Sequence, residues 1–204
     1  MAAPADADSE RDPVLATDEQ GIRVRSPAAA AVVSTAAAAA FAAFIFVAGQ
    51  VRIPLPWTPV PITLQTLVVF LGAAWLGSAR GVGGPLLFAA AAAVGLPVLS
   101  GFRGGFVALT GPTGGYVFGW LLAAYLLGRC LGGRPTSTVR LVALMVAASS
   151  LVFGCGLLHL TLLLRVPLDQ ALWMGLWPFL PGDTLKLVLG VAIYRRWPGL
   201  LSTP

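Results

Sequence analysis

The feature that most constrains this chain is a series of long apolar runs without charged side chains, most of them closed by a single arginine. When helical, a run of roughly 20 such residues matches the thickness of a bilayer core. Hydrophobic residues make up 57% of the chain and charged residues 10%, against about a quarter charged in an average soluble domain. Too few polar side chains remain to cover a water-soluble fold. We therefore predict an all-α, polytopic membrane protein.

Residues 27–197 are predicted to form one membrane domain with six transmembrane helices. Proline and glycine mark the helix ends, because proline lacks the N–H donor that a helix interior requires. A short re-entrant or interfacial helix is expected at 171–177, ahead of the last span. The six predicted spans cover residues 26–51, 62–79, 81–102 (stopped near Gly95), 116–131, 141–164 and 183–196.

The charged residues also predict how the chain is oriented. Residues 1–26 hold most of the acidic residues and are expected to be a disordered cytoplasmic tail, with 198–204 as a C-terminal tail. Arginine and lysine accumulate in the cytoplasmic loops of membrane proteins. With both termini in the cytoplasm of the cell, the outer loops hold only Arg52, Arg103 and Arg165. The inner segments then hold Arg11, Arg23, Arg25, Arg80, Arg129, Arg134, Arg140, Arg195 and Arg196.

Three proline- and glycine-rich segments fall on the outer face in this orientation, namely residues 55–61, 101–115 and 177–182. Irregular backbone at membrane depth is tolerated only where it is buried in protein or lines a cavity. We therefore predict that these segments converge on a pocket that opens outward. The alternative is that they are ordinary connecting loops.

Asp183 and Lys186 are the strongest candidates for contacts to a ligand. They stand three residues apart, which places them on one face of a helix. Charged side chains inside the bilayer cost about 2.5–3.5 kcal/mol on insertion scales and are usually paired and functional. Asp183 has a second interpretation as a helix N-cap, because it follows Pro181 and Gly182 at the predicted helix start. Lys186 is the one lysine in the chain and opposes the helix dipole, which favours a ligand contact.

Five further residues are candidate binding residues, each with a structural alternative. Arg103 lies in a glycine-rich loop and can bind a carboxylate, or it can reach to the membrane surface as an anchor. Gln65 and Thr63 begin the second predicted helix, where they can bind a ligand or a neighbouring helix. Tyr116 and Trp57 occur at the same level, where they can stack on a ligand or belong to the interfacial aromatic belt.

Several functional classes are excluded by what the sequence lacks. One histidine and two isolated cysteines cannot build a metal centre or a catalytic triad, so we predict no metal, no cofactor and no enzyme. The sequence has no Gly-x-x-x-x-Gly-Lys phosphate loop, so ATP-driven transport would need a partner. The arginines are dispersed rather than clustered, which predicts no nucleic-acid binding.

Small residues recur at four-residue spacing along the first predicted helix. This spacing lets another helix approach closely in a membrane. The partner is either a separate transmembrane subunit or a helix of the same bundle. The residues in these rows are Ser34, Ala38 and Ala42, together with Ala39 and Ala43.

Three motifs occur in a fixed order along the chain. They are Pro-Val-Pro-Ile-Thr-Leu-Gln-Thr-Leu at 59–67, Gly-Pro-Thr-Gly-Gly-Tyr at 111–116 and Pro-Gly-Asp-x-x-Lys at 181–186. Together they resemble the BioY family of biotin-transporter substrate-binding subunits. The resemblance covers about residues 30–197 and leaves the acidic N-terminal tail outside it.

The resemblance implies a six-helix substrate-capture subunit of an energy-coupling-factor transporter, with biotin bound near the outer face. It also implies that Asp183, Lys186 and Arg103 contact biotin. The first helix would dock on a transmembrane coupling subunit that two cytoplasmic ATPases drive. Two alternatives stay open: a subunit of this architecture for another vitamin such as thiamine or riboflavin, and a stand-alone oligomeric biotin facilitator.

Overall fold

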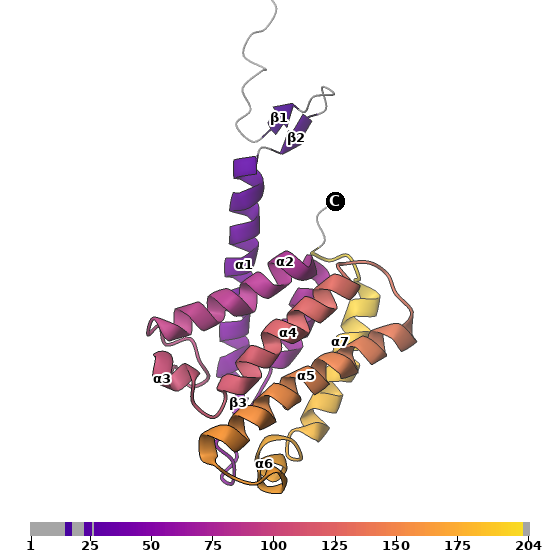
Figure 1. The fold of residues 1–204 in the computed structure, drawn as a ribbon. Helices are drawn as coiled ribbons and strands as arrows, with labels where there is room; N and C mark the ends of the chain where they lie inside the picture. Colours follow the sequence, from indigo (N-terminus) through magenta and orange to yellow (C-terminus); the bar gives the residue numbers. More distant parts are fainter. Residues whose placement is uncertain (1–14, 18–22, 26, 202–204) are drawn as a thin grey trace, which may run out of the picture.

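The chain folds into a bundle of helices, seen in a computed structural model that describes residues 15–17, 23–25 and 27–201. The structure is 72% helical, which confirms the predicted helical class. Within the described residues the strands form two antiparallel pairs, and each strand has two or three residues. In chain order the elements are β1 (Leu15–Thr17), β2 (Arg23–Arg25), α1 (Pro27–Gln50), β3 (Arg52–Ile53), β4 (Ile62–Thr63), α2 (Gln65–Ala93), α3 (Phe106–Leu109), α4 (Gly114–Cys130), α5 (Thr138–Leu164), α6 (Leu168–Gly175) and α7 (Leu180–Arg196) (Figure 1).

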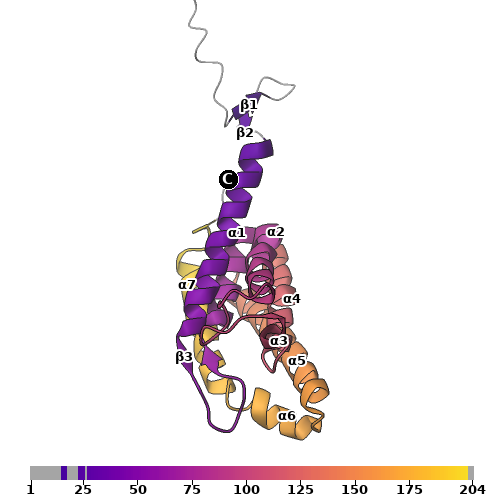
Figure 2. The ribbon, with the colours of Figure 1, turned by 90° about the vertical axis from the view of Figure 1, so that its left-hand side faces the viewer.

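The long helices pack around one apolar core. α4 lies between α2 and α5, α1 packs on α2, and α7 contacts both α2 and α5. Figures 1 and 2 show α6 closing one end of this bundle, while α1 extends beyond the other end. Phe88, Leu127, Met145 and Tyr194 are almost fully buried where α2, α4, α5 and α7 meet. These helices therefore form a fixed frame around the site described below.

Glycines let α4 approach its two neighbours closely. A Cβ atom on Gly119 would lie 2.6 Å from the Cα atom of Val152 on α5. A Cβ atom on Gly128 would lie 2.6 Å from the backbone carbon of Gly77 on α2. Helices in membranes associate through such small residues, because close packing replaces the hydrophobic driving force available in water.

α2 contains the boundary predicted between the second and third spans, at a different residue. Gly77 has φ of 79° and ψ of 177°, so the helix is interrupted there and consists of two arms. The prediction placed the boundary at Arg80, which lies inside the second arm. Glycine adopts a positive φ without steric cost, so the backbone breaks at Gly77 although the nearest charge comes later.

α6 and α7 form a bent pair with an angle of 54° between them, in agreement with the short helix predicted ahead of the last span. α7 begins at Leu180, earlier than the predicted start at Asp183. Pro181 is tolerated there because the first turn of a helix needs no N–H donor. Phe179 precedes the helix and no side chain caps it. The N-cap interpretation of Asp183 is therefore wrong.

Among the described residues, three helices are long and apolar enough to cross a membrane, or four when the bent α6–α7 pair is taken as one span. Figure 2 shows the start of α1 and the end of α7 at the same end of the bundle. Of the predicted N-terminal tail, only β1 and β2 are described, and they pair with each other. The rest of that tail, and the last part of the predicted C-terminal tail, lie outside the described residues.

Candidate ligand-binding site

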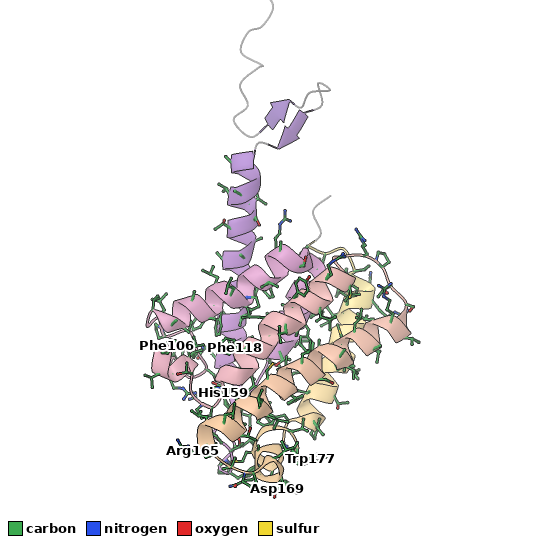
Figure 3. The ribbon with its side chains drawn as sticks, in the orientation of Figure 1. Phe106, Phe118, His159, Arg165, Asp169 and Trp177 are labelled. Carbon is green, nitrogen blue, oxygen red and sulfur yellow. The ribbon has the colours of Figure 1, made fainter. Side chains whose placement is uncertain are left out.

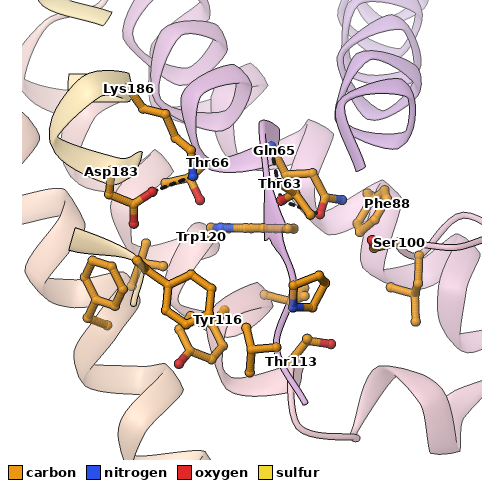
Figure 4. A pocket seen from close by; sticks show the side chains of 17 residues that line it. Thr63, Gln65, Thr66, Phe88, Ser100, Thr113, Tyr116, Trp120, Asp183 and Lys186 are labelled. Atoms are coloured by element: carbon orange, nitrogen blue, oxygen red, sulfur yellow. Dashed lines mark hydrogen bonds and ion pairs between the residues drawn. The ribbon is translucent and has the colours of Figure 1, made fainter. Parts of the chain in front are cut away.

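A cavity opens at the end of the bundle where α4 and α7 begin (Figure 4). It contains about 660 Å³ of space between the atoms, counted to its open mouth. Pro61, Thr113 and Phe179 all line the cavity. The three irregular segments 55–61, 101–115 and 177–182 therefore meet at one cavity, as their composition predicts.

Asp183 and Lys186 form an ion pair on the cavity wall. Lys186 Nζ donates to Asp183 Oδ1 at 2.5 Å, and the dashed line in Figure 4 marks this contact. The Asp183 side chain is 17% exposed and the Lys186 side chain is 11% exposed. Both come from the N-terminal half of α7, so the helix presents a carboxylate and an ammonium group side by side. A polar ligand can meet both a hydrogen-bond acceptor and a donor there, in surroundings that strengthen such bonds.

Gln65 and Thr63 form a second polar group in the wall. Thr63 Oγ1 donates to Gln65 Oε1 at 3.2 Å and accepts from the Gln65 backbone N–H at 3.4 Å. Gln65 is 5% exposed, and Gly49 of α1 leaves the space for its side-chain amide. A Cβ atom on Gly49 would lie 2.6 Å from Gln65 Nε2. The amide is thus held by Thr63 of β4 on one side and by α1 on the other.

Tyr116 contributes its ring to the wall and its hydroxyl group to the fold. Tyr116 Oη donates to the Gly175 carbonyl oxygen at 2.8 Å, which ties α4 to α6. The ring packs on Gly156 of α5, where any side chain would overlap it. The hydroxyl group therefore has a partner within the protein, and the aromatic face is what the residue offers a ligand.

The sequence did not predict two further polar residues on the wall, Ser100 and Trp120. Their side-chain polar atoms, Ser100 Oγ and Trp120 Nε1, are buried and have no hydrogen-bond partner in the described part of the chain. Most buried polar groups in proteins are hydrogen-bonded, so such an atom beside a cavity indicates a place for a ligand or water. Trp120 lies one helical turn after Tyr116, and this spacing was the signal available in the sequence. No sequence feature distinguished Ser100.

The structure does not bring Trp57 or Arg103 to the cavity wall. The Trp57 side chain is 63% exposed. Arg103 is also exposed, and its Nε atom donates to the Ser100 carbonyl oxygen at 3.3 Å. Their assignment as binding residues stays a prediction. The other predicted residues, Thr63, Gln65, Tyr116, Asp183 and Lys186, all line the cavity.

His159 of α5 holds the loop ahead of α4. Its Nε2 atom lies 3.0 Å from the carbonyl oxygens of both Thr110 and Gly111. Because a carbonyl oxygen only accepts, Nε2 carries the proton and donates to both. Figure 3 shows His159 above Arg165 and Asp169, toward the end of the bundle that carries α6. The histidine fixes the loop that brings Thr113 to the cavity.

The small residues of α1 separate into two groups in the structure. Ser34, Ala38 and Ala42 are half-buried, and Ala38 faces Gly83 of α2. Ala39 and Ala43 are exposed. The first row is therefore used within the bundle, and the second row remains free in the described chain.

Known families provide an independent comparison. The family model of the BioY family matches residues 20–203. This chain belongs to the BioY family. The biotin transporter BioY of Thermotoga maritima is 36% identical to it over 156 residues, which cover 76% of this chain and 90% of that relative. The biotin transporter BioY of Rhodobacter capsulatus is 38% identical over 167 residues, which cover 76% and 87%.

A solved structure confirms that this BioY chain shares a known fold. The structure is described as the S-component for biotin from an ECF-type ABC transporter, where ECF is the energy-coupling factor. It matches with a TM-score of 0.76 and 29% sequence identity, covering 88% of this chain and 100% of that chain. The resemblance drawn from the three motifs is thereby confirmed. The BioY chain is a multi-pass protein of the cell membrane.

Proposed function

We propose that this BioY chain captures biotin for uptake, as the substrate-binding subunit of an energy-coupling-factor transporter. The single observation that carries the proposal is the cavity whose wall presents the Asp183–Lys186 pair within a BioY fold. Relatives of this chain are named biotin transporters, and its structural neighbour is described as a biotin S-component. These names support biotin over thiamine or riboflavin as the substrate.

The chemistry of the cavity suits the two ends of biotin. The ureido ring offers two N–H donors and one carbonyl acceptor, which match the carboxylate of Asp183 and the ammonium group of Lys186. The apolar body of the ligand suits the aromatic faces of Tyr116 and Trp120. Gln65 adds a further polar group to the cavity wall. Asp183, Lys186, Gln65 and Tyr116 are the residues we assign to biotin binding.

We infer six spans, formed by α1, the two arms of α2, α4, α5 and α7. The start of α1 and the end of α7 at the same end of the bundle support this count. The excess of arginine in the segments at that end supports a cytoplasmic location for both termini. The cavity then opens toward the outside of the cell.

We further propose that Ala39 and Ala43 form the surface that docks on a transmembrane coupling subunit. Both are exposed on α1, and small residues at this spacing allow a foreign helix to approach closely. The sequence contains no phosphate loop, so in this arrangement ATPase partners supply the energy for uptake. Copurification of coupling and ATPase subunits with this chain would distinguish this arrangement from a stand-alone facilitator.

Calorimetric titration of the detergent-purified chain with biotin, thiamine and riboflavin, without ATP, tests the proposed substrate. We expect saturable heat with biotin alone, because every proposed contact comes from this one polypeptide. Heat with thiamine or riboflavin, and none with biotin, would overturn the substrate assignment while leaving the fold intact.

A further inference from the structure

The turn between α2 and α3 is closed on itself and fastened to the end of α1. The Leu99 N–H donates to the Arg103 carbonyl oxygen at 2.9 Å, which leaves residues 100–102 as the tip of the turn. Gly101 and Phe102 have φ of 77° and 57°, a left-handed conformation that reverses the chain sharply. The Phe102 ring packs edge-on against Phe46 of α1, with centroids 6.0 Å apart.

Gln50, the last residue of α1, holds both sides of this turn. Its Oε1 atom accepts from the Gly101 N–H at 3.2 Å, and its Nε2 atom donates to the Leu99 carbonyl oxygen at 3.4 Å. One side chain thus satisfies the backbone groups on either side of Ser100. These two bonds fix the orientation of the peptide units that flank Ser100, and so they fix the direction in which its Cα–Cβ bond points.

The hydroxyl group of Ser100 lies on the cavity wall without a partner. Ser100 is 8% exposed, and its Oγ atom has no hydrogen-bond partner in the described chain. Figure 4 shows Ser100 and Phe88 on the opposite side of the cavity from Asp183 and Lys186. A ligand that spans the cavity from the ion pair would therefore bring its far end to Ser100.

Two guanidinium groups lie against the same turn. Arg103 Nε donates to the Ser100 carbonyl oxygen, and the Arg52 guanidinium packs on Gly101, where a Cβ atom would overlap it. No acidic side chain of the described residues pairs with either arginine in an ion pair. A turn that carries a free hydroxyl group and two guanidinium groups favours an anionic ligand group, and a carboxylate in particular.

We propose that Ser100 binds the tail carboxylate of the ligand and that Gln50 is the residue that positions it. The inference rests on the proposed function, since it takes biotin as the ligand. It assigns the ureido ring to Asp183 and Lys186, and the carboxylate to the turn at 99–103. Arg52 and Arg103 add positive charge at that end.

The test compares biotin with an analogue whose carboxylate is replaced by a methyl group, on purified full-length variants. Ser100→Ala should weaken biotin binding about ten- to a hundred-fold, the effect of one hydrogen bond to a charged group, and should change analogue binding by less than about threefold. Gln50→Leu should show the same selective loss. The double variant should bind biotin no more weakly than the weaker single variant, because both changes act on one hydroxyl group.

Analogue binding by the same variants reports that they are folded, and Ser150→Ala and Gln170→Leu serve as matched controls on exposed positions of α5 and α6. Equal weakening of biotin and analogue by Ser100→Ala, or no weakening of either, would overturn the carboxylate contact. A selective loss for Ser100→Ala with a non-selective loss for Gln50→Leu would overturn the positioning role. If the wild-type chain bound thiamine or riboflavin and not biotin, the proposed function itself would fail first.

Discussion

Asp183 and Lys186 either contact the ligand or exist only to neutralise each other, and a double-mutant cycle separates the two cases. The changes are Asp183→Asn and Lys186→Met, alone and together. Neither removes a helix cap, because α7 begins at Leu180 and Asp183 donates its backbone N–H to the Phe179 carbonyl oxygen at 2.8 Å. The backbone of α7 should therefore be retained in all three variants.

The expected magnitudes follow from the burial of the pair. The side chains of Asp183 and Lys186, 17% and 11% exposed, are largely removed from water. Each charge is therefore stabilised mainly by the groups it contacts in the cavity and less by solvent. A hydrogen bond to a charged group contributes about 1.5–3 kcal/mol, which is roughly ten- to a hundred-fold in affinity. If both residues contact biotin, each single variant loses about that much. The double variant then binds worst, and its loss differs from the sum of the two single losses because the two side chains are in direct contact.

Mutual neutralisation predicts a different pattern. Each single variant would leave one buried charge unpaired, which is strongly unfavourable, whereas removing both charges is often neutral. The double variant would then bind biotin nearly as well as the wild-type chain. Isothermal titration calorimetry of the four proteins measures the cycle, and thermal unfolding of each reports stability. Wild-type affinity in the double variant would refute our assignment of this pair to the ligand.

Two further predictions concern the helices. Ala39→Leu or Ala43→Leu should leave biotin binding unchanged and abolish uptake in cells that contain the coupling and ATPase subunits, whereas Ala147→Leu on the exposed face of α5 should affect neither. Unimpaired uptake by the α1 variants would show that this face of α1 meets only lipid. Gly119→Ala should destabilise the bundle by about 1–3 kcal/mol, because the added Cβ atom meets the α5 backbone, whereas Gly154→Ala, at a position that faces open space, should not. Equal unfolding temperatures for the two variants would contradict the close approach of α4 and α5.

The helices were predictable where a charge-free apolar run ended at a charge. The runs at 26–51 and 141–164 became α1 and α5 within a few residues of the predicted ends. The break in α2 was placed at Arg80 and occurs at Gly77, because a charge marks where the chain leaves the membrane and not where its hydrogen bonding stops. The start of α7 was misplaced because Pro181 interrupts a helix interior but not its first turn.

The site was predictable only in part, for a related reason. Thr63, Gln65, Asp183 and Lys186 are polar residues in apolar surroundings, so their type and position drew attention to them. Serine and tryptophan are common residue types in membrane helices and loops. Ser100 and Trp120 are significant because each has an unpaired polar atom at the cavity. Whether a buried hydroxyl or indole N–H has a partner depends on tertiary contacts, which local sequence does not specify.

Covalent mapping of the bound ligand tests most directly whether biotin binds in the cavity between α2, α4 and α7. A photoreactive biotin analogue that keeps its carboxylate free would be cross-linked to the purified chain and located by mass spectrometry, with excess biotin as competitor. We predict competable labelling within residues 60–66, 99–100, 113–120 and 179–186, which contain residues of the cavity wall. Competable labelling confined to the apolar groove around Phe41 and Trp75, between α1 and α2, would contradict the account.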